Sequence, residues 1–194
     1  MSEVLLFHHA QGLTPGVVAL ADELRHAGHT VHTPDLFGGR TFPTLEEGLA
    51  HVAATGFDEV VVRGLRATDG LPEDLVYAGI SLGVLPAQRL AQTRRGARGA
   101  VLLEACAPAA TWGGWPAGVP VQVHGMDGDP VFAGEGDLDA ARELVTQAGA
   151  TARAELFTYP GDRHLFTDRS LPGHDAAAAE LVTARVLAFL AALG

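Results

Sequence analysis

Short apolar runs alternate along this chain with longer stretches in which apolar residues recur with the period of a helix. The runs have the length and composition of strands that are buried on both faces of a sheet. The predicted strands lie at residues 4–7, 29–34, 75–78, 100–104, 119–124 and 154–159. The predicted helices lie at residues 15–27, 45–54, 57–68, 82–93, 138–148 and 175–193. This alternation predicts an α/β protein, a three-layer α/β/α sandwich with a mostly parallel sheet of about six strands.

The stretch 57–68 fits a strand by composition, because Val60, Val61 and Val62 are β-branched. A strand there would directly precede the strand at 75–78, and two parallel strands need a crossover between them. We therefore expect a helix. The chain has no internal repeat, low-complexity segment or linker, so residues 1–194 are expected to form a single domain.

The formal net charge of −10 argues against nucleic acid or anionic membrane surfaces as partners. All 13 basic residues are arginines, which excludes chemistry that needs a lysine, such as a Schiff base or a P-loop. Cys106 is the only cysteine, so no internal disulfide can form. We see no signal-peptide pattern and expect no transmembrane helix, and we therefore expect a cytoplasmic location.

The motif Gly79-Ile80-Ser81-Leu82-Gly83 joins an apolar strand to the following helix. In this context G-x-S-x-G forms a sharp turn that exposes the serine hydroxyl at the end of the strand. Glycine two residues before and after the serine removes collisions with neighbouring backbone. An ordinary glycine-rich turn would also fit, but the flanking strand and helix favour Ser81 as a nucleophile.

The carboxyl ends of parallel strands meet at one edge of a sheet, where ligands gather. Asp127 and Asp129 follow the strand at 119–124, and His164 follows the last strand. A serine hydroxyl attacks only when an imidazole takes its proton and a carboxylate orients the imidazole. We predict Ser81, Asp129 and His164 as a catalytic triad, with Asp127 as the alternative acid. Both aspartates also fit ordinary turns, and His164 also fits a plain loop histidine.

An oxyanion at this site needs backbone N–H donors. The amide of Leu82 lies where a helix begins, and the dipole of the helix favours a negative charge there. The second donor is expected just after the first strand, from Ala10 or Gln11. His9 either lines the pocket there or is an ordinary hydrogen-bonded histidine.

Three segments together resemble the dienelactone hydrolase family of α/β-hydrolases. They are the Ser81 motif, His124-Gly125 leading to Asp129-Pro130, and Tyr159-Pro160-Gly161-x-x-His164-x-Phe166. The resemblance covers nearly the whole chain and implies a compact α/β-hydrolase fold without a large cap. It also implies hydrolysis of small esters or lactones through an acyl-enzyme, without a metal or cofactor.

The chain departs from that family in three ways. Dienelactone hydrolases proper carry cysteine where Ser81 stands. Their acidic residue after the first strand is not evident here. Their arginines for a substrate carboxylate have no secure equivalent, and Arg66, Arg163 and Arg169 are only candidates. The resemblance therefore implies the fold and the triad but not the dienelactone substrate.

The predicted pocket has several candidate walls. Phe37, Trp112 and Trp115 either line it or pack in the core. Cys106 does not lie in a sharp glycine-flanked turn like that of Ser81, and it is expected to be a buried or pocket-lining thiol rather than a nucleophile. His26, His29 and His32 have a metal-like spacing, but they cross a helix end, a turn and a strand, so we expect no metal site.

We therefore expect a serine hydrolase that acts on a small-molecule ester or lactone, has no nucleic-acid or membrane partner, and forms a monomer or a small homo-oligomer. Two alternatives stay open: a thioesterase or acyl transferase with the same triad, and a catalytically silent α/β-hydrolase-like binding protein. A dinucleotide-binding protein is disfavoured, because no G-x-G-x-x-G follows the first strand.

Overall fold

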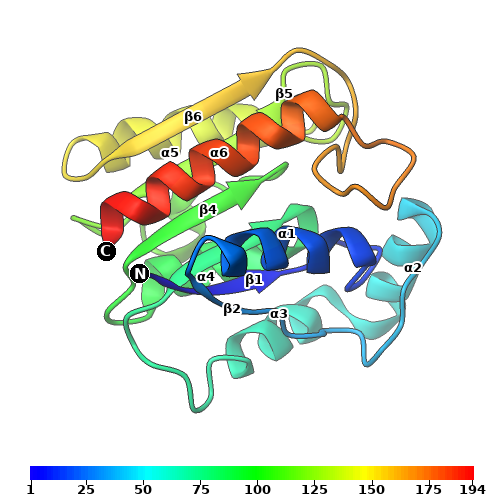
Figure 1. Cartoon of the computed structure of the whole chain (residues 1–194), viewed down its shortest axis with the longest axis horizontal. Coiled ribbons are helices and arrows are strands. Elements are labelled where there is room, and N and C mark those ends of the chain that lie inside the picture. Colours follow the sequence, from blue (N-terminus) through cyan, green and yellow to red (C-terminus); the bar gives the residue numbers. More distant parts are fainter.

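The computed structural model describes all residues from Met1 to Gly194. Its centre is a six-stranded sheet in which every neighbouring pair is parallel, with the order β2-β1-β3-β4-β5-β6 (Figure 1). The strands are β1 (Glu3–Phe7), β2 (Thr30–His32), β3 (Val76–Ile80), β4 (Gly99–Leu103), β5 (Val121–Met126) and β6 (Ala154–Tyr159). The predicted α/β class and six-stranded parallel sheet are confirmed.

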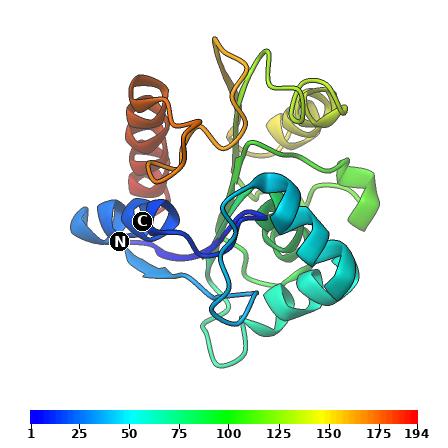
Figure 2. The ribbon, with the colours of Figure 1, turned by 90° about the vertical axis from the view of Figure 1, so that its right-hand side faces the viewer.

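Helices cover both faces of the sheet and make the three predicted layers (Figure 2). On one face lie α1 (Pro15–His26) and α6 (Ala176–Leu193). On the other lie α2 (Leu45–Thr55), α3 (Phe57–Arg66), α4 (Val84–Thr93) and α5 (Asp137–Gly149). Two short 3₁₀ helices, η1 (Ser81–Gly83) and η2 (Ala109–Trp112), follow β3 and β4.

Local sequence signals explain where several helices begin. The Thr14 side chain accepts a hydrogen bond from the Val17 N–H, and Pro15 occupies the first position of α1. The Thr44 side chain caps α2 in the same way.

The helix expected in residues 57–68 is present as α3. The second strand is shorter than predicted and covers residues 30–32, because only Val31 of the three is buried in the core.

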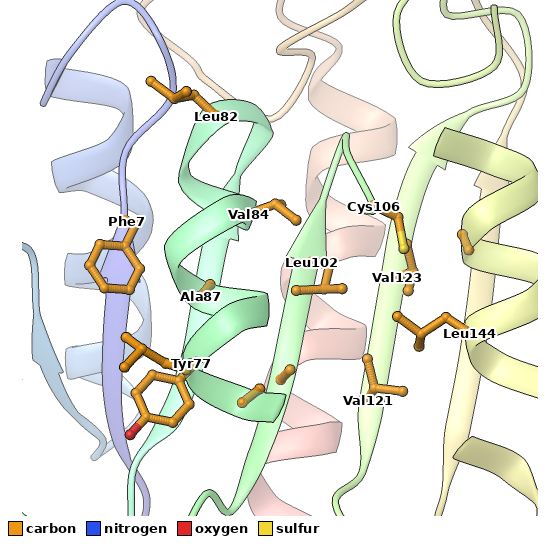
Figure 3. Close-up of a cluster of buried hydrophobic side chains, with 14 of the residues drawn as sticks. Phe7, Tyr77, Leu82, Val84, Ala87, Leu102, Cys106, Val121, Val123 and Leu144 are labelled. Carbon is orange, nitrogen blue, oxygen red and sulfur yellow. The ribbon is translucent and has the colours of Figure 1, made fainter. Parts of the chain in front are cut away.

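The sheet has a hydrophobic core on each face. Along β1, Leu5 and Phe7 belong to the core under α2 to α5, whereas Val4 and Leu6 belong to the core under α1 and α6. This alternation follows from the two-residue period of a strand, and it explains why all four residues after Glu3 in β1 are apolar. Figure 3 shows the first of these cores packed between the sheet and the helices.

The closing helix α6 is long and apolar enough, by length and a mean hydropathy of 1.8, to cross a membrane. No such segment was expected from the sequence. The helix also contains Glu180 and Arg185, and its buried side chains Val182, Val186 and Phe189 pack into the core of the sheet. The core helices that meet the same length and hydropathy criteria are mostly buried, whereas 28% of this helix is buried.

Candidate active site

The turn after β3 holds Ser81 in a strained backbone conformation. Its φ of 49° lies in the left-handed region, which residues other than glycine rarely adopt. A Cβ on Gly79 would overlap the Gly83 carbonyl, and a Cβ on Gly83 would overlap the Phe7 carbonyl of β1. The two glycines therefore allow α4 to begin directly against the strands. This is the sharp turn that the G-x-S-x-G motif predicts.

A hydrogen-bonded chain of three side chains starts at this turn. The Ser81 Oγ lies 2.9 Å from the His164 Nε2. The His164 Nδ1 lies 2.7 Å from the Asp129 Oδ2. Asp129 is fully buried and the His164 side chain nearly so, while Ser81 is half-buried. The structure thus brings Ser81 and Asp129 to His164, although they lie 83 and 35 positions before it in the chain.

Asp129, and not Asp127, is the carboxylate that contacts His164. Its second oxygen, Oδ1, accepts a hydrogen bond of 2.8 Å from the Val131 N–H, which fixes the orientation of the carboxylate. Asp127 is exposed, and its Oδ1 accepts a bond from the Gly161 N–H at 3.3 Å. Asp129 thus lies beneath His164, whereas Asp127 lies in a turn that contacts the loop containing His164.

The surroundings of His164 favour its protonated form. Burial alone would disfavour the charged imidazolium, but the hydrogen bond to Asp129 and the charges of Glu104 and Asp129 outweigh it and raise the pKa of His164 above 6.5. Asp137 adds to the same effect. An imidazole with a raised pKa is a stronger proton acceptor, while neighbouring carboxylates stabilise the imidazolium.

The loop after β1 is fixed by a buried histidine–carboxylate pair. The His9 Nε2 lies 2.8 Å from the Asp168 Oδ2, and both side chains are fully buried. Thr14 and Ser170 also donate to Asp168. Burial opposes ionisation of Asp168, but these hydrogen bonds outweigh it and lower its pKa to about 2. His9 therefore has a structural partner and does not line the cavity, which decides between the two roles that the sequence left open.

This pair determines which amides of the loop are free. The Gln11 N–H donates to the His9 Nδ1 at 3.2 Å, whereas the N–H of the buried residue Ala10 donates no hydrogen bond. Buried amides without a partner are rare in proteins. Gly48 of α2 lies so close that a Cβ there would overlap the Ala10 carbonyl. Ala10 is therefore the better placed of the two candidate donors.

A cavity of about 490 Å³ opens beside Ser81 and His164. Apolar residues from α2, α3, α4 and the loop after β4 form most of its wall. Asp137, the first residue of α5, and Glu135, in the loop just before it, also line the cavity. Cys106 is part of this wall. Figure 3 places Leu82 and Cys106 toward the carboxyl ends of the strands, and Tyr77 and Val121 toward the opposite ends.

The Cys106 side chain is fully buried. Burial and the nearby charge of Asp137 raise the pKa of its thiol, so the thiol stays protonated at neutral pH. The Cys106 N–H also donates to the Asp137 Oδ2 at 3.0 Å. These observations favour a structural thiol in the wall of the cavity.

Three other predicted wall residues lie elsewhere. Phe37 packs edge-on against His8 and His51 in the core near α2. Trp112 belongs to η2 and does not reach the cavity, and the Trp115 indole N–H donates to the Val119 carbonyl at 2.8 Å. The positions of Trp112 and Trp115 depend on how the long loop after β4 folds back on α4, where Gln92 donates to the Ala109 and Gly114 carbonyls, and local sequence does not encode this contact.

The candidate arginines for a substrate carboxylate also lie away from the cavity. Arg66 is exposed in the last turn of α3. Arg163 donates to the His174 carbonyl, and Arg169 pairs with Glu23 of α1. No group of three or more His, Cys, Asp or Glu side chains is arranged to hold a metal ion.

Sequence reasoning missed Glu104, which follows β4 with a φ of 64° and is fully buried. Its Oε1 accepts hydrogen bonds from the N–H and the hydroxyl of Thr167, which follows His164 closely in the chain, and its Oε2 has no partner. Burial raises the pKa of Glu104. A carboxylate at a strand's carboxyl end was the available signal, because such residues meet at the edge that carries the site.

Comparison with known proteins agrees with this architecture. The structure of Thermogutta terrifontis esterase 2 aligns with 100% of this chain and 84% of its own, with a TM-score of 0.73 and 16% identity. A dienelactone hydrolase-like promiscuous phosphotriesterase from metagenomic libraries aligns with 100% of this chain and 87% of its own, with a TM-score of 0.70 and 19% identity. A Xanthomonas campestris protein assigned to the α/β-hydrolase superfamily aligns with 99% of each chain, with a TM-score of 0.68 and 18% identity.

The fold is therefore that of an α/β-hydrolase, in a compact form that spans nearly the whole of a similarly sized neighbour. The model of the dienelactone hydrolase family matches residues 115–194, which confirms the resemblance over the part of the chain that carries Asp129 and His164. Ser81 and the loop after β1 lie outside the matched residues. No curated protein matches the chain significantly.

Proposed function

We propose that this protein is a serine hydrolase of the dienelactone hydrolase type that cleaves a small carboxylic ester or lactone through an acyl-enzyme. The observation that carries the proposal is the chain of hydrogen bonds from Ser81 through His164 to Asp129, which ends in a cavity large enough for a small substrate. The strained turn supports it, because it holds the Ser81 hydroxyl at the end of β3.

In the proposed mechanism the Ser81 Oγ attacks the acyl carbon of the substrate. The His164 Nε2 takes the hydroxyl proton and then donates it to the oxygen of the leaving alcohol. Asp129 keeps the proton of the neutral ring on Nδ1 and stabilises the imidazolium. Water then attacks the acyl-enzyme, again giving its proton to His164, and the acid product leaves with Ser81 restored.

The negative oxygen of the tetrahedral intermediate would accept hydrogen bonds from the N–H groups of Leu82 and Ala10. Leu82 lies at the start of the helical segment after Ser81, where amides point toward the site. The free Ala10 N–H supports its part, and the His9–Asp168 pair supports the loop that carries it. Removing one such donor in other enzymes costs about 3–4 kcal/mol of transition-state stabilisation.

Labelling with a fluorophosphonate tests the proposal. Thermogutta terrifontis esterase 2 has a form phosphonylated by sarin, so an organophosphorus probe suits this fold. We expect the wild type to form an adduct that mass spectrometry locates on Ser81, and Ser81→Ala to form none. Ser2 and Ser170 serve as internal controls, because neither hydroxyl contacts a histidine that faces the cavity.

A folded protein that forms no adduct and hydrolyses no ester would overturn the proposal in favour of a silent binding protein. Comparison of matched oxygen esters and thioesters then tests the reaction type. We expect turnover of oxygen esters. Turnover restricted to thioesters would replace the ester hydrolase with a thioesterase that uses the same residues.

A further inference from the structure

The cavity beside Ser81 has walls that are mostly apolar, with charges of one sign. Ten of the fifteen residues that line it are hydrophobic. Its charged residues, apart from His164, are Glu135 and Asp137, and it has no arginine. Neither carboxylate has a salt-bridge partner. Apart from His164, the wall therefore has no cationic side chain that would offset a negative charge on a substrate.

Glu135 lies close enough to Asp137 to affect its titration, and Asp137 in turn affects His164. Burial and the charge of Glu135 raise the pKa of Asp137, while its hydrogen bond from the Cys106 N–H acts in the opposite direction. Asp129 adds a further negative charge beneath the histidine. Since the chain as a whole carries a net charge of −10, the surrounding field reinforces the local one.

The rim of the cavity is apolar and exposed. Leu49 of α2 is 40% exposed and Phe57 at the start of α3 is 48% exposed, and both line the cavity. Only three other large hydrophobic residues are comparably exposed in the whole chain, namely Met1, Val18 and Leu181. An apolar group bound against Leu49 and Phe57 would remove this surface from water, which is favourable.

We propose that the site is selective for uncharged esters with an apolar chain and rejects esters that carry a carboxylate. In this assignment Leu49 and Phe57 hold the apolar chain, and Glu135 and Asp137 repel an anionic one. The inference rests on the proposed hydrolase function and specifies its substrate class. It also separates this chain from an enzyme that acts on an anionic lactone such as a dienelactone.

A matched pair of substrates tests the charge selectivity. The 4-nitrophenyl ester of pentanoic acid and the mono-4-nitrophenyl ester of glutaric acid differ in that a terminal methyl group is replaced by a carboxylate. We expect the wild type to have a kcat/KM at least about 50-fold higher for the pentanoate, because the anionic chain meets like charges in an apolar wall. We expect Glu135→Gln to raise the ratio of kcat/KM for the glutarate to kcat/KM for the pentanoate by about tenfold at low salt.

Asp139→Asn is the matched control, because Asp139 is an exposed carboxylate four positions after Glu135, in the first turn of α5, that does not line the cavity. It changes the net charge by the same amount as Glu135→Gln, and we expect it to leave the ratio of the two substrates unchanged. Equal turnover of pentanoate and glutarate by the wild type would overturn the inference while leaving the hydrolase proposal intact. Failure to hydrolyse either ester, together with absence of labelling at Ser81, would instead contradict the proposed function.

The apolar rim is tested with a series of 4-nitrophenyl esters from acetate to hexanoate. We expect kcat/KM to rise about two- to fourfold for each added methylene, since a fully buried methylene contributes about 0.8 kcal/mol. We expect Leu49→Gln to flatten this rise, because the apolar chain would then lie against a polar side chain. Leu181→Gln is the control: Leu181 is 51% exposed on α6 and lies outside the cavity, so the rise should persist.

A wild type that prefers acetate to hexanoate would overturn the assignment of the rim. So would a Leu181→Gln variant that flattens the series as much as Leu49→Gln, because the effect would then not depend on the cavity. Both variants replace exposed residues, and matching far-UV circular dichroism and urea midpoints would establish that they are folded.

Discussion

Replacing Asp129 with asparagine should nearly abolish activity, because the structure dictates how the new amide must point. Asp129 Oδ1 accepts a hydrogen bond from the Val131 N–H at 2.8 Å, and Oδ2 contacts the His164 Nδ1. In Asp129→Asn only the amide oxygen can accept from Val131. The NH₂ group is therefore turned toward His164, where it donates to Nδ1 and forces the ring proton onto Nε2.

A ring with its proton on Nε2 cannot accept the proton of Ser81. An equivalent substitution in other triads lowers kcat by about 10⁴-fold, which corresponds to about 5.5 kcal/mol in activation free energy. We expect a loss of that order in kcat, measured with a chromogenic ester at pH 8. Because the new amide side chain has the volume of the aspartate and keeps the bond to Val131, the urea midpoint should change much less than the activity.

Asp127→Asn is the matched control. Asp127 is exposed and its carboxylate accepts a hydrogen bond only from the Gly161 N–H, so the variant should keep its kcat within about threefold. If Asp129→Asn retained a tenth or more of the wild-type kcat, the reasoning from the Val131 bond would be refuted. A crippled Asp127→Asn beside a mild Asp129→Asn would mean that the acid is assigned to the wrong residue.

Three further predictions concern titration and packing. His164 must be neutral to accept a proton and its pKa is raised, so kcat/KM should rise with pH through an apparent pKa above 6.5; a flat profile from pH 5 to 9 would contradict this role. Gly83→Ala should lower the free energy of unfolding in urea by about 3 kcal/mol or more, because the new Cβ overlaps the Phe7 carbonyl. Gly149 has open space around it, so Gly149→Ala should not measurably change the free energy of unfolding. Asp168→Ala should lower the free energy of unfolding by about 3 kcal/mol at pH 7, because it leaves the buried side chains that bond to Asp168 without a partner. The pKa of Asp168 is lower in the folded protein than in the unfolded chain, where it lies near 3.8. Its ionised side chain therefore contributes to the free energy of unfolding at pH values above 3.8, and this contribution is lost as the pH falls toward 2. An Asp168→Ala variant as stable as wild type at pH 7 would refute the account.

Much of the architecture was encoded locally. Apolar runs bounded by turns predicted six strands, and the crossover requirement correctly favoured a helix at residues 57–68 over a strand. The positions of Ser81, Asp129 and His164 were inferable for the same reason, because the carboxyl ends of parallel strands meet at one edge of the sheet.

The order of strands and helices along the chain, the sharp turn at Ser81 and the placement of Ser81, Asp129 and His164 at one edge of the sheet could be predicted from sequence, whereas the buried Glu104 at the same edge was missed. The choice between Asp127 and Asp129, the free amide on Ala10 rather than Gln11, and the pairing of His9 with Asp168 became visible only in the folded chain. Periodicity and turn chemistry act over a few residues, so a linear pattern records them. Hydrogen-bond partners and cavity walls join segments far apart in the chain, so they depend on how whole helices and loops pack.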